Sequence, residues 1–439
     1  MIMSTAREDA LDIFLYALKA SRVEPAMERR LVCRDGVMEI DGHRYVLGGY
    51  ERLVLIAIGK AAHTMATAFL WRVGDVRERF EGIIVGPEDE AAPSEGFRMY
   101  RGGHPSPNAG SMAAAADVLR TLQALTERDL VVFLISGGGS ALMEQFLKPG
   151  VSLESIAATH KALVESGAPI AAINAVRKHL SAVKGGRLAA AAAPAEQLTI
   201  FVSDVPAGEL DALSSGPTFP DRSSVEDVYR IAKEYGLEDR LPAEIAEMII
   251  GRSLVETPKE GDAIFARSRW TVLLDSASLE EAAAERAREL GWRVEIDNHC
   301  DEWSAERAVE YLIGRLGEMR RLRERVCLLS AGEVTVQVPR DATGKGGRNQ
   351  HFALIASEQI AGSDVVVLSG GSDGIDGNSP AAGALVDGTT LARAEEMGFP
   401  VNATLAAFDG HTLLERLGDT ITTGPTGNNL RDLRILLAP

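Results

Sequence analysis

The chain has 439 residues, 46% hydrophobic and 25% charged, a composition typical of a globular protein. Its formal net charge of −17 argues against general binding to nucleic acid or to anionic membrane surfaces. Three scattered cysteines without a C-x-x-C pair support neither a disulfide framework nor a zinc site. No apolar run predicts a membrane span, and charges from Arg7 onward do not fit a secretory signal, so we expect a cytoplasmic protein.

The first predicted elements are a helix over residues 5–21 and a strand over Leu53 to Ile58 that is buried on both faces. Gly59-Lys60 follows this strand, and helical periodicity resumes over residues 61–71. Lys60 therefore lies at the carboxyl end of a strand, where open α/β sheets bind ligands, although a solvated surface lysine is the alternative. His104 lies in a proline-stiffened loop, where it would orient a substrate or bond to the backbone.

The most informative stretch is the predicted strand 131–135 with the loop that follows it, Ser136-Gly137-Gly138-Gly139-Ser140. Glycine N–H groups can approach an anion closely, and a helix beginning near Ala141 would add partial positive charge. We therefore hypothesise that this loop binds phosphate; the alternative is a glycine-rich turn. Neither the P-loop motif nor the dinucleotide fingerprint G-x-G-x-x-G is present.

Residues 171–189 form a basic segment within an acidic protein. Asn174, Arg177, Ser181 and Lys184 are spaced three and four apart, which predicts one face of a helix. The helix would end at Lys184-Gly185-Gly186-Arg187, where the backbone could meet an anion, or the segment is simply a solvated helix face. The predicted strand 198–202 is followed by Asp204 and Glu209, carboxylates that suit hydrated Mg²⁺. Asp204 could equally cap a turn.

The second half of the chain repeats the pattern of a strand followed by small and acidic residues. A strand over 326–329 precedes Gly332 and Glu333, and a strand over 365–368 precedes Asp373 and Asp376. Arg348 lies in the glycine-rich segment 344–350, which precedes a predicted helix that ends near residue 360. Two α/β domains that present glycine-rich strand ends to a shared cleft are the simplest arrangement.

Nine stretches in this order resemble one known family over nearly the whole chain, the class II glycerate 2-kinases or MOFRL family. They are AIGKAA, GGHPSPNAGS, LISGGGSALM, NAVRKHLSAVKGGRLA, SDVPAG with SSGPTFPD, LSAGEVTV, GKGGRNQHFAL, SGGSDGIDGNSPAAGA and TGPTGNNLRDLRILL. The resemblance implies a larger Rossmann-like α/β/α domain over residues 1–255 and a smaller α/β MOFRL-type domain over 256–439, with an interdomain cleft. The last residues are open to packing on the first domain.

The activity that the resemblance implies is transfer of the γ-phosphoryl of ATP to the 2-hydroxyl of D-glycerate, giving 2-phosphoglycerate, with a divalent metal. The family's catalytic lysine and arginine fall on Lys60 and Arg348. Two departures are Glu209, where we expect aspartate, and GNNLRD near the C-terminus. A hydroxypyruvate reductase, a name also used in this family, and a non-enzymatic phosphosugar- or nucleotide-binding regulator are the alternatives.

We expect the following roles. Asp204 joins Lys60 and Arg348 in catalysis, as base or metal ligand, and Glu209 completes an Mg²⁺ site. ATP is held by Ser136, Gly137, Gly138, Gly139, Ser140, Gly332 and Glu333, and Lys184 serves the nucleotide or, with Arg177, the glycerate carboxylate. The other substrate-binding residues are His104, Asn174, Asp373 and Asp376. No nucleic-acid or membrane partner is expected, and a homodimer remains open.

Overall fold

The computed structural model describes residues 2–206, 208–322, 324–339 and 342–439. The chain forms two compact units, one of Ala26–Leu273 and one of Met1–Pro25 together with Leu274–Pro439, here called the larger and the smaller unit. This division differs from the expected boundary at residue 255. The N-terminal helix belongs to the smaller unit, and strand β9 (Ser268–Leu274) joins the sheet of the larger one.

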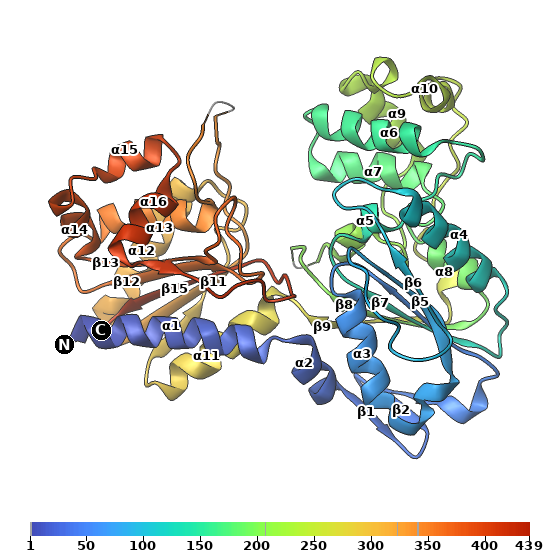
Figure 1. Cartoon of the computed structure of the whole chain (residues 1–439), viewed down its shortest axis with the longest axis horizontal. Helices are drawn as coiled ribbons and strands as arrows, with labels where there is room; N and C mark the ends of the chain where they lie inside the picture. The colour runs from blue at the N-terminus through green and yellow to red at the C-terminus, as the bar shows by residue number, and fades with distance from the viewer. Residues whose placement is uncertain (1, 207, 323, 340–341) are drawn as a thin grey trace. The chain divides into compact units, whose positions relative to one another are not determined.

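A six-stranded sheet in the order β6-β5-β4-β7-β8-β9 forms the centre of the larger unit (Figure 1). Its first five members in chain order are β4 (Leu53–Ile58), β5 (Phe80–Gly86), β6 (Phe97–Arg101), β7 (Leu130–Ile135) and β8 (Glu196–Val202). These five strands are parallel. Every residue of β4 and β7 is buried, as their unbroken apolar sequences predict for central strands of a parallel sheet.

The strand order reverses between β4 and β7, which are neighbours in the sheet. From β4 the chain moves outward through β5 to β6, and it then returns to β7 and continues through β8 on the other side. Open α/β sheets bind ligands at such a switch point, beyond the carboxyl ends of the strands. Lys60 follows β4 and the Ser136–Ser140 loop follows β7, so the fold places both at this point.

Some of the remaining elements of the larger unit pack on this sheet, and others form a group of their own. Helix α3 (Ala62–Val73) packs on β4 and β5, and α4 (Ala109–Gln123) packs on β5 and β6. A separate group of helices shares its own apolar cluster (Figure 1): α6 (Leu153–Glu165), α7 (Ile170–Leu180), α9 (Val225–Glu234) and α10 (Ala243–Ile250). The short elements are α2 (Val23–Arg30), α5 (Gly139–Leu142), α8 (Arg187–Ala192) and the antiparallel strands β1 (Leu31–Arg34), β2 (Val37–Ile40) and β3 (His43–Val46).

The smaller unit contains a mixed six-stranded sheet in the order β10-β11-β15-β12-β13-β14. Its strands are β10 (Arg293–Ile296), β11 (Val326–Ala331), β12 (Val366–Gly371), β13 (Gly383–Asp387), β14 (Thr420–Ile421) and β15 (Asp432–Ala438). β15 is antiparallel to both β11 and β12, so these two strands run in the same direction with β15 between them. The last residues thus form a central strand of this sheet, and the start of β15 lies at the carboxyl ends of β11 and β12.

Helices cover the sheet of the smaller unit (Figure 1): α1 (Ile2–Ala20), α11 (Ser276–Glu289), α12 (Ala305–Leu322), α13 (Arg348–Gln359), α14 (Thr390–Glu396), α15 (Val401–Ala406) and α16 (Gly410–Leu417). The predicted opening helix is confirmed as α1, which packs on α11, β12 and β15. Its periodic apolar side chains, including Ile13 and Phe14, are fully buried. A second apolar cluster, formed largely by α12 and α13, holds those helices to the sheet.

Two local expectations are wrong. The helix expected after the glycine loop is a single turn, α5, and does not extend beyond Leu142. The helix expected to run through residue 184 ends at Leu180, because Ser181 is extended and pairs with Phe146. Gly185 and Gly186 then take positive φ values of 55° and 80°, which suit glycine and not a continuing helix.

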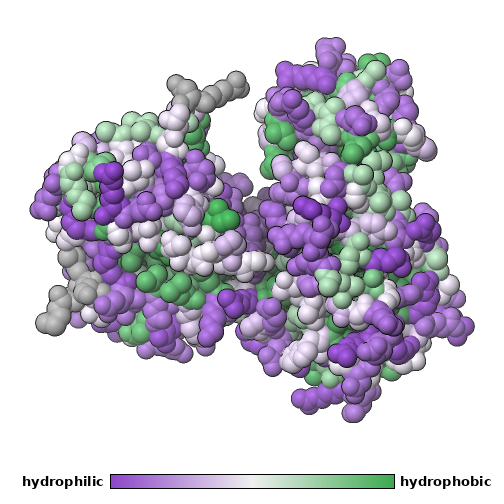
Figure 2. All heavy atoms as spheres, in the orientation of Figure 1, coloured by the Kyte–Doolittle hydropathy of each residue, from purple (hydrophilic) through white to green (hydrophobic). Residues whose placement is uncertain are grey.

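The surface seen in Figure 2 is mainly hydrophilic, with small scattered apolar areas. Single exposed side chains such as Trp71, which is 66% accessible, are ordinary for a globular surface. In the part of the chain that the structure describes, no helix is long and apolar enough to cross a membrane. Cys33, Cys300 and Cys327 are all free thiols.

Candidate active site

Lys60 and the glycine loop are joined directly at the switch point of the larger unit. The N–H of Lys60 donates to the carbonyl of Gly137 at 2.9 Å, and the N–H of Ala61 donates to Ser136 Oγ at 3.0 Å. Gly59, at φ 128°, lies where any Cβ would overlap Ser136. The ends of β4 and β7 are therefore fixed to each other, while the Lys60 side chain stays exposed.

The three glycines of this loop bring side chains from three other loops together. A Cβ at Gly137 would overlap the carboxylate of Asp204, which follows β8. A Cβ at Gly138 would lie 3.1 Å from Lys60 Cγ and 3.3 Å from His104 Cδ2. The absence of side chains on the loop thus lets Lys60, His104 and Asp204 approach it closely, as backbone recognition of a ligand requires.

Two serines beneath the loop hold its second half. Ser214 Oγ accepts from the N–H of Gly139 at 3.1 Å and donates to the carbonyl of Ser136 at 2.8 Å. Ser140 Oγ lies 2.7 Å from Ser215 Oγ, which in turn donates to Asn174 Oδ1 at 3.4 Å. The N–H of Gly139 is therefore already engaged inside the protein, and Asn174 supports the loop from below.

His104 carries a neutral imidazole more readily than an ordinary histidine. Burial lowers its pKa, and the nearby charge of Lys60 lowers it further. A neutral imidazole beside an ammonium group can donate or accept a hydrogen bond without adding charge to the site. The structure thus places His104 near Lys60, and a role in orienting substrate stays a prediction.

Lys184 does not reach the surface of the larger unit. Its ammonium forms a fully buried ion pair with Glu144, which also accepts from Ser181 Oγ at 2.6 Å and lies 3.2 Å from His160 Nε2. Burial alone would raise the pKa of Glu144, but Lys184 and His160 together lower it below its ordinary value. Arg177 is half-buried, which lowers its pKa, and the negative charge of Glu144 opposes that shift. Its Nε has no hydrogen-bond partner among the described residues.

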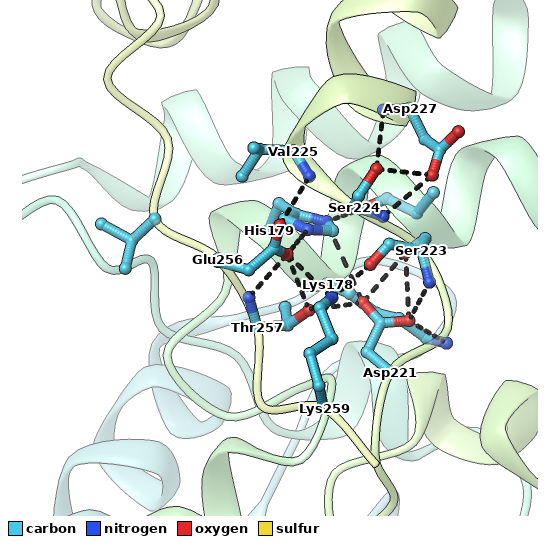
Figure 3. A network of polar contacts seen from close by, with 12 residues as sticks. Lys178, His179, Asp221, Ser223, Ser224, Val225, Asp227, Glu256, Thr257 and Lys259 are labelled. Carbon is cyan, nitrogen blue, oxygen red and sulfur yellow. Dashed lines mark hydrogen bonds and ion pairs between the residues drawn. The ribbon is translucent and has the colours of Figure 1, made fainter. Parts of the chain in front are cut away.

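The other charges of the basic segment are also neutralised internally (Figure 3). Lys178 Nζ lies 3.1 Å from Asp221 and 3.3 Å from Asp211, and His179 Nε2 lies 2.9 Å from Glu256. This segment therefore ties α7 to residues 221–259 and does not present a row of free cations. The alternative of a solvated helix face is equally wrong, because Lys178 and His179 are buried.

The described residues contain no cluster of three or more histidine, cysteine or acidic side chains that could cage a metal ion. Mg²⁺ does not need such a cage, since it commonly binds through one or two carboxylates together with substrate phosphates. Asp204, partly exposed against the glycine loop, fits that requirement. Glu209 is exposed and lies directly before a short 3₁₀ helix, Leu210–Ser215.

In the smaller unit, Arg348 is held by two carboxylates. Its Nε and Nη2 donate to Asp432 at 2.6 and 3.1 Å, and Nη2 also lies 2.6 Å from Glu333 Oε1. Glu333 follows β11, and Asp432 begins the neighbouring strand β15. Burial lowers the pKa of Arg348, but its bonds to Asp432 and Glu333 outweigh this and raise it, so the guanidinium stays charged.

Asp376 borders the cavity described below, but its carboxylate is engaged within the protein. It is buried and accepts from the N–H groups of Asn349 and Gln350 at 3.0 and 2.9 Å, at the first turn of α13. The Gln350 side chain donates to it as well, at 2.9 Å. Asp376 thus occupies the N-terminus of the helix that carries Arg348, where a phosphate would otherwise be favoured.

A cavity of about 970 Å³ opens beside these residues, wholly within the smaller unit. Glu333, Arg348 and Asp373 lie on its polar side. Its remaining wall includes Val334, Val336 and the stacked rings of His351 and Phe408, whose centroids are 5.3 Å apart. A cavity with a charged side and an apolar, aromatic side is suited to a small organic anion or a nucleotide.

Comparison with known proteins identifies the relationship. Residues 9–250 match the family described as a domain of unknown function, DUF4147, and residues 326–432 match the MOFRL family. The chain is 36% identical to D-glycerate 2-kinase of Thermotoga maritima over 391 residues, 88% of this chain and 90% of that protein. It is 33% identical to glycerate 2-kinase of Pyrococcus horikoshii over 442 residues, 100% of this chain and 98% of that protein.

The chain belongs to the MOFRL family of glycerate kinases. A solved structure of glycerate kinase from Thermotoga maritima superposes on it with a TM-score of 0.85 at 32% identity, covering 99% of this chain and all of that one. The fold expected from the MOFRL resemblance, two α/β domains with a parallel sheet in the larger one, is confirmed. Two relatives from Agrobacterium vitis carry a provisional hydroxypyruvate reductase name instead.

Sequence reasoning on this MOFRL chain missed Ser214, Glu144 and Asp432. Ser214 lay inside a quoted motif, but nothing in its spacing showed that it supports the glycine loop. Glu144 follows the helical turn directly and gave no signal of burial. Asp432 stands in the run GNNLRD, which drew attention as a departure from the family and carried no signal that it would face Arg348.

Proposed function

We propose that this chain is a glycerate 2-kinase, which transfers the γ-phosphoryl of ATP to the 2-hydroxyl of D-glycerate and releases 2-phosphoglycerate and ADP. The observation that carries the proposal is the convergence of Lys60, His104 and Asp204 on the Ser136–Ser140 loop at the switch point of a doubly wound sheet. Family membership supports the same reaction, since the Thermotoga and Pyrococcus relatives are named for it.

In this proposal the glycine loop holds phosphate groups of ATP through its backbone. Gly137 and Gly138 are its partly exposed centre, while the N–H of Gly139 donates to Ser214. Ser136 and Ser140 fix the loop by their own bonds and so preorganise it. Preorganised donors stabilise developing charge without reorganisation cost at the moment of reaction, which is the main source of catalysis in phosphoryl transfer.

Lys60 and Arg348 neutralise the charge of the transferred group, Lys60 as a point charge and Arg348 as a planar fork. Asp204 acts as base toward the glycerate hydroxyl or as metal ligand. Bound Mg²⁺ would be held by Asp204, with Glu209 close by in sequence, and would neutralise phosphate charge. Gly332, Glu333 and Asp373 serve the ligand from the smaller unit, while Lys184 and Asp376 enter as supports, because both are buried in internal contacts.

Glycerate recognition falls to neutral and cationic groups of the larger unit. His104 would form a hydrogen bond with a hydroxyl group of glycerate, and the half-buried Arg177 would bind the carboxylate. Asn174 contributes indirectly, through Ser215 and the glycine loop. We also propose a cytoplasmic enzyme; a homodimer stays a prediction.

The test is a coupled assay for ADP across small hydroxy acids, with and without Mg²⁺, and with the phosphorylated carbon located by NMR. We expect ADP release that requires both D-glycerate and Mg²⁺, and phosphate on carbon 2. Absence of ADP together with oxidation of NADH by hydroxypyruvate would replace the kinase by the reductase. Ligand-induced thermal stabilisation without any turnover would favour the regulator.

The residue assignments are tested by Lys60→Ala and Arg348→Ala, each expected to lower turnover about 10³-fold. Lys161→Ala in α6 and Arg321→Ala in α12 are matched controls, since both side chains are exposed surface cations outside the proposed site. We expect the controls to stay within about twofold of the wild type. Near-normal turnover of either test variant would remove that residue from the mechanism.

A further inference from the structure

Arg348 makes two ion pairs that differ in kind. Asp432 takes both Nε and Nη2, a bidentate contact at 2.6 and 3.1 Å, and its side chain is only 2% accessible. Glu333 meets Nη2 alone, at 2.6 Å, and its side chain is 33% accessible. One carboxylate is thus built into the protein interior, and the other lies at the wall of the 970 Å³ cavity.

The positions of the two carboxylates explain this difference. Asp432 begins β15, pairs in register with Gly371 of β12 and accepts from the N–H of Gly332 beyond β11 through its own carbonyl. It is therefore held from both neighbouring strands. Glu333 lies past the end of β11, and only its backbone is fixed, with its N–H donating to Asp301 at 2.9 Å and its carbonyl accepting from Glu302 at 2.7 Å.

The charge balance at this cluster disfavours an incoming anion. One guanidinium between two carboxylates leaves a net charge of −1, and Asp373 and Glu302 line the same cavity. Phosphate that approaches Arg348 would meet this negative charge and would have to compete with Glu333 for Nη2. Breaking the Glu333 contact frees one N–H of Nη2 without removing the bidentate pair with Asp432.

We propose that Asp432 is the positioning residue that keeps Arg348 oriented throughout turnover, and that Glu333 is an exchangeable carboxylate that occupies the phosphate's place on Arg348 in the empty enzyme. This inference rests on the proposed function, because it assigns the exchange to the phosphoryl group of the nucleotide. Glu333 leaves Nη2 when an anionic phosphate oxygen arrives, and it returns when the product departs. It thereby keeps the guanidinium ordered and paired between turnovers.

The environment of Glu333 supports this exchange. Burial raises its pKa and so does Asp432, whereas the positive charges of Arg348 and Arg431 oppose the rise; the net shift is upward. Protonated Glu333 no longer competes for the guanidinium. Phosphate binding therefore tightens as pH falls through the pKa of Glu333. The charged and titratable groups around this carboxyl are Arg348, Asp432, Arg431 and Asp301, together with Glu302, His351, Asp373 and Asp376, which line the same cavity.

The test measures binding of the non-hydrolysable ATP analogue AMP-PNP to the full-length enzyme by calorimetry, at fixed Mg²⁺, from pH 5 to 8. Glu333→Gln removes the competing charge and is expected to tighten binding at pH 8 at least tenfold and to flatten its pH dependence. Glu302→Gln is the matched control, because it removes a charge from the same cavity without touching Arg348. We expect it to change the affinity less than threefold.

For Asp432, kcat and KM separate a positioning role from a structural one. Asp432→Asn should lower kcat about 100-fold with a smaller change in the KM for ATP, and Asp432→Glu should restore part of kcat. Equal or weaker AMP-PNP binding by Glu333→Gln, or an unaltered pH slope, would overturn the exchange. If Asp432→Asn does not fold, Glu333→Gln decides the exchange and Asp432→Glu decides the positioning role, which a wild-type kcat in Asp432→Glu would overturn. Wild-type enzyme without glycerate-dependent ADP release would refute the proposed function instead, a separate readout.

Discussion

The carboxylate of Asp204 lies against the Cα of Gly137, so that any side chain on residue 137 would overlap it. The loops that follow the neighbouring parallel strands β7 and β8 are therefore in close contact at Gly137 and Asp204. The absence of a Cβ at one position sets where the acidic group of another lies. This contact joins the proposed phosphate loop to the proposed metal or base position.

Gly137→Ala should therefore displace Asp204 and lower kcat about 100-fold, the cost typical of a misplacement of about 1 Å at a reacting centre. The fold should survive, since the displaced atoms are at the end of a side chain that can turn away. Steady-state kinetics and thermal melting measure the two effects. Gly48→Ala, at an exposed position with no atom near the added methyl, is the control and should change neither.

The buried pair of Lys184 and Glu144 should matter for stability more than for ligand binding. Lys184→Met leaves an uncompensated buried carboxylate, which typically costs about 3–5 kcal/mol of unfolding free energy. Urea denaturation measures it. Lys161→Met breaks the exposed pair with Glu165 in the same unit and should cost less than about 0.5 kcal/mol. Unchanged stability of Lys184→Met with a large rise in the KM for ATP would return Lys184 to the nucleotide site.

Asp373 and Asp376, assigned together from sequence, should separate in experiment. Asp376→Asn replaces the carboxylate at the first turn of α13 and should lower stability by about 1–2 kcal/mol, as the loss of a helix cap does. Asp373→Asn alters a partly exposed group of the cavity wall and should lower kcat/KM with little effect on melting. Calorimetric melting and turnover on the same preparations compare them, and equal patterns would contradict the distinction.

The network around His179 predicts a specific acid sensitivity (Figure 3). Burial raises the pKa of Glu256, but hydrogen bonds from Lys259, His179 and two backbone N–H groups lower it from 4.5 to about 2. Because the folded pKa is depressed, this carboxylate stabilises the fold above pH 4.5, and that contribution is lost as pH falls toward 2. The side chain is 42% exposed, so solvent screens part of the effect.

Glu256→Gln should accordingly lower stability at pH 7 and flatten the decline between pH 4.5 and 2, measured as chemical denaturation across that range. The exposed Glu260 lies four residues away, and Glu260→Gln should leave both the level and the slope as in the wild type. A mutant curve parallel to the wild-type curve would show that the network does not stabilise the folded chain through the ionised carboxylate.

The sequence by itself determined the elements that local pattern can encode. Unbroken apolar runs predicted β4 and β7, because a strand buried on both faces has no polar positions, and periodic apolar residues predicted α1 and α3. The position of Lys60 and of the Ser136–Ser140 loop at the ends of strands followed from the same reasoning, whereas the pairing of those two strands came from the structure. Family resemblance then connected Lys60 with Arg348, which no local pattern could do.

Tertiary structure alone decided which charges are free. Lys184 and Asp376 looked like surface ligands because sequence shows residue type and spacing but not the groups that pack against them. A buried charge without a partner is costly, and each of these two groups interacts with residues distant in sequence. Lys184 forms an ion pair with Glu144, and Asp376 accepts hydrogen bonds from the first turn of α13. Asp432 pairs with Arg348 because β15 lies between β11 and β12 in the sheet. This pairing joins segments distant in the chain, so no single stretch of sequence reveals it.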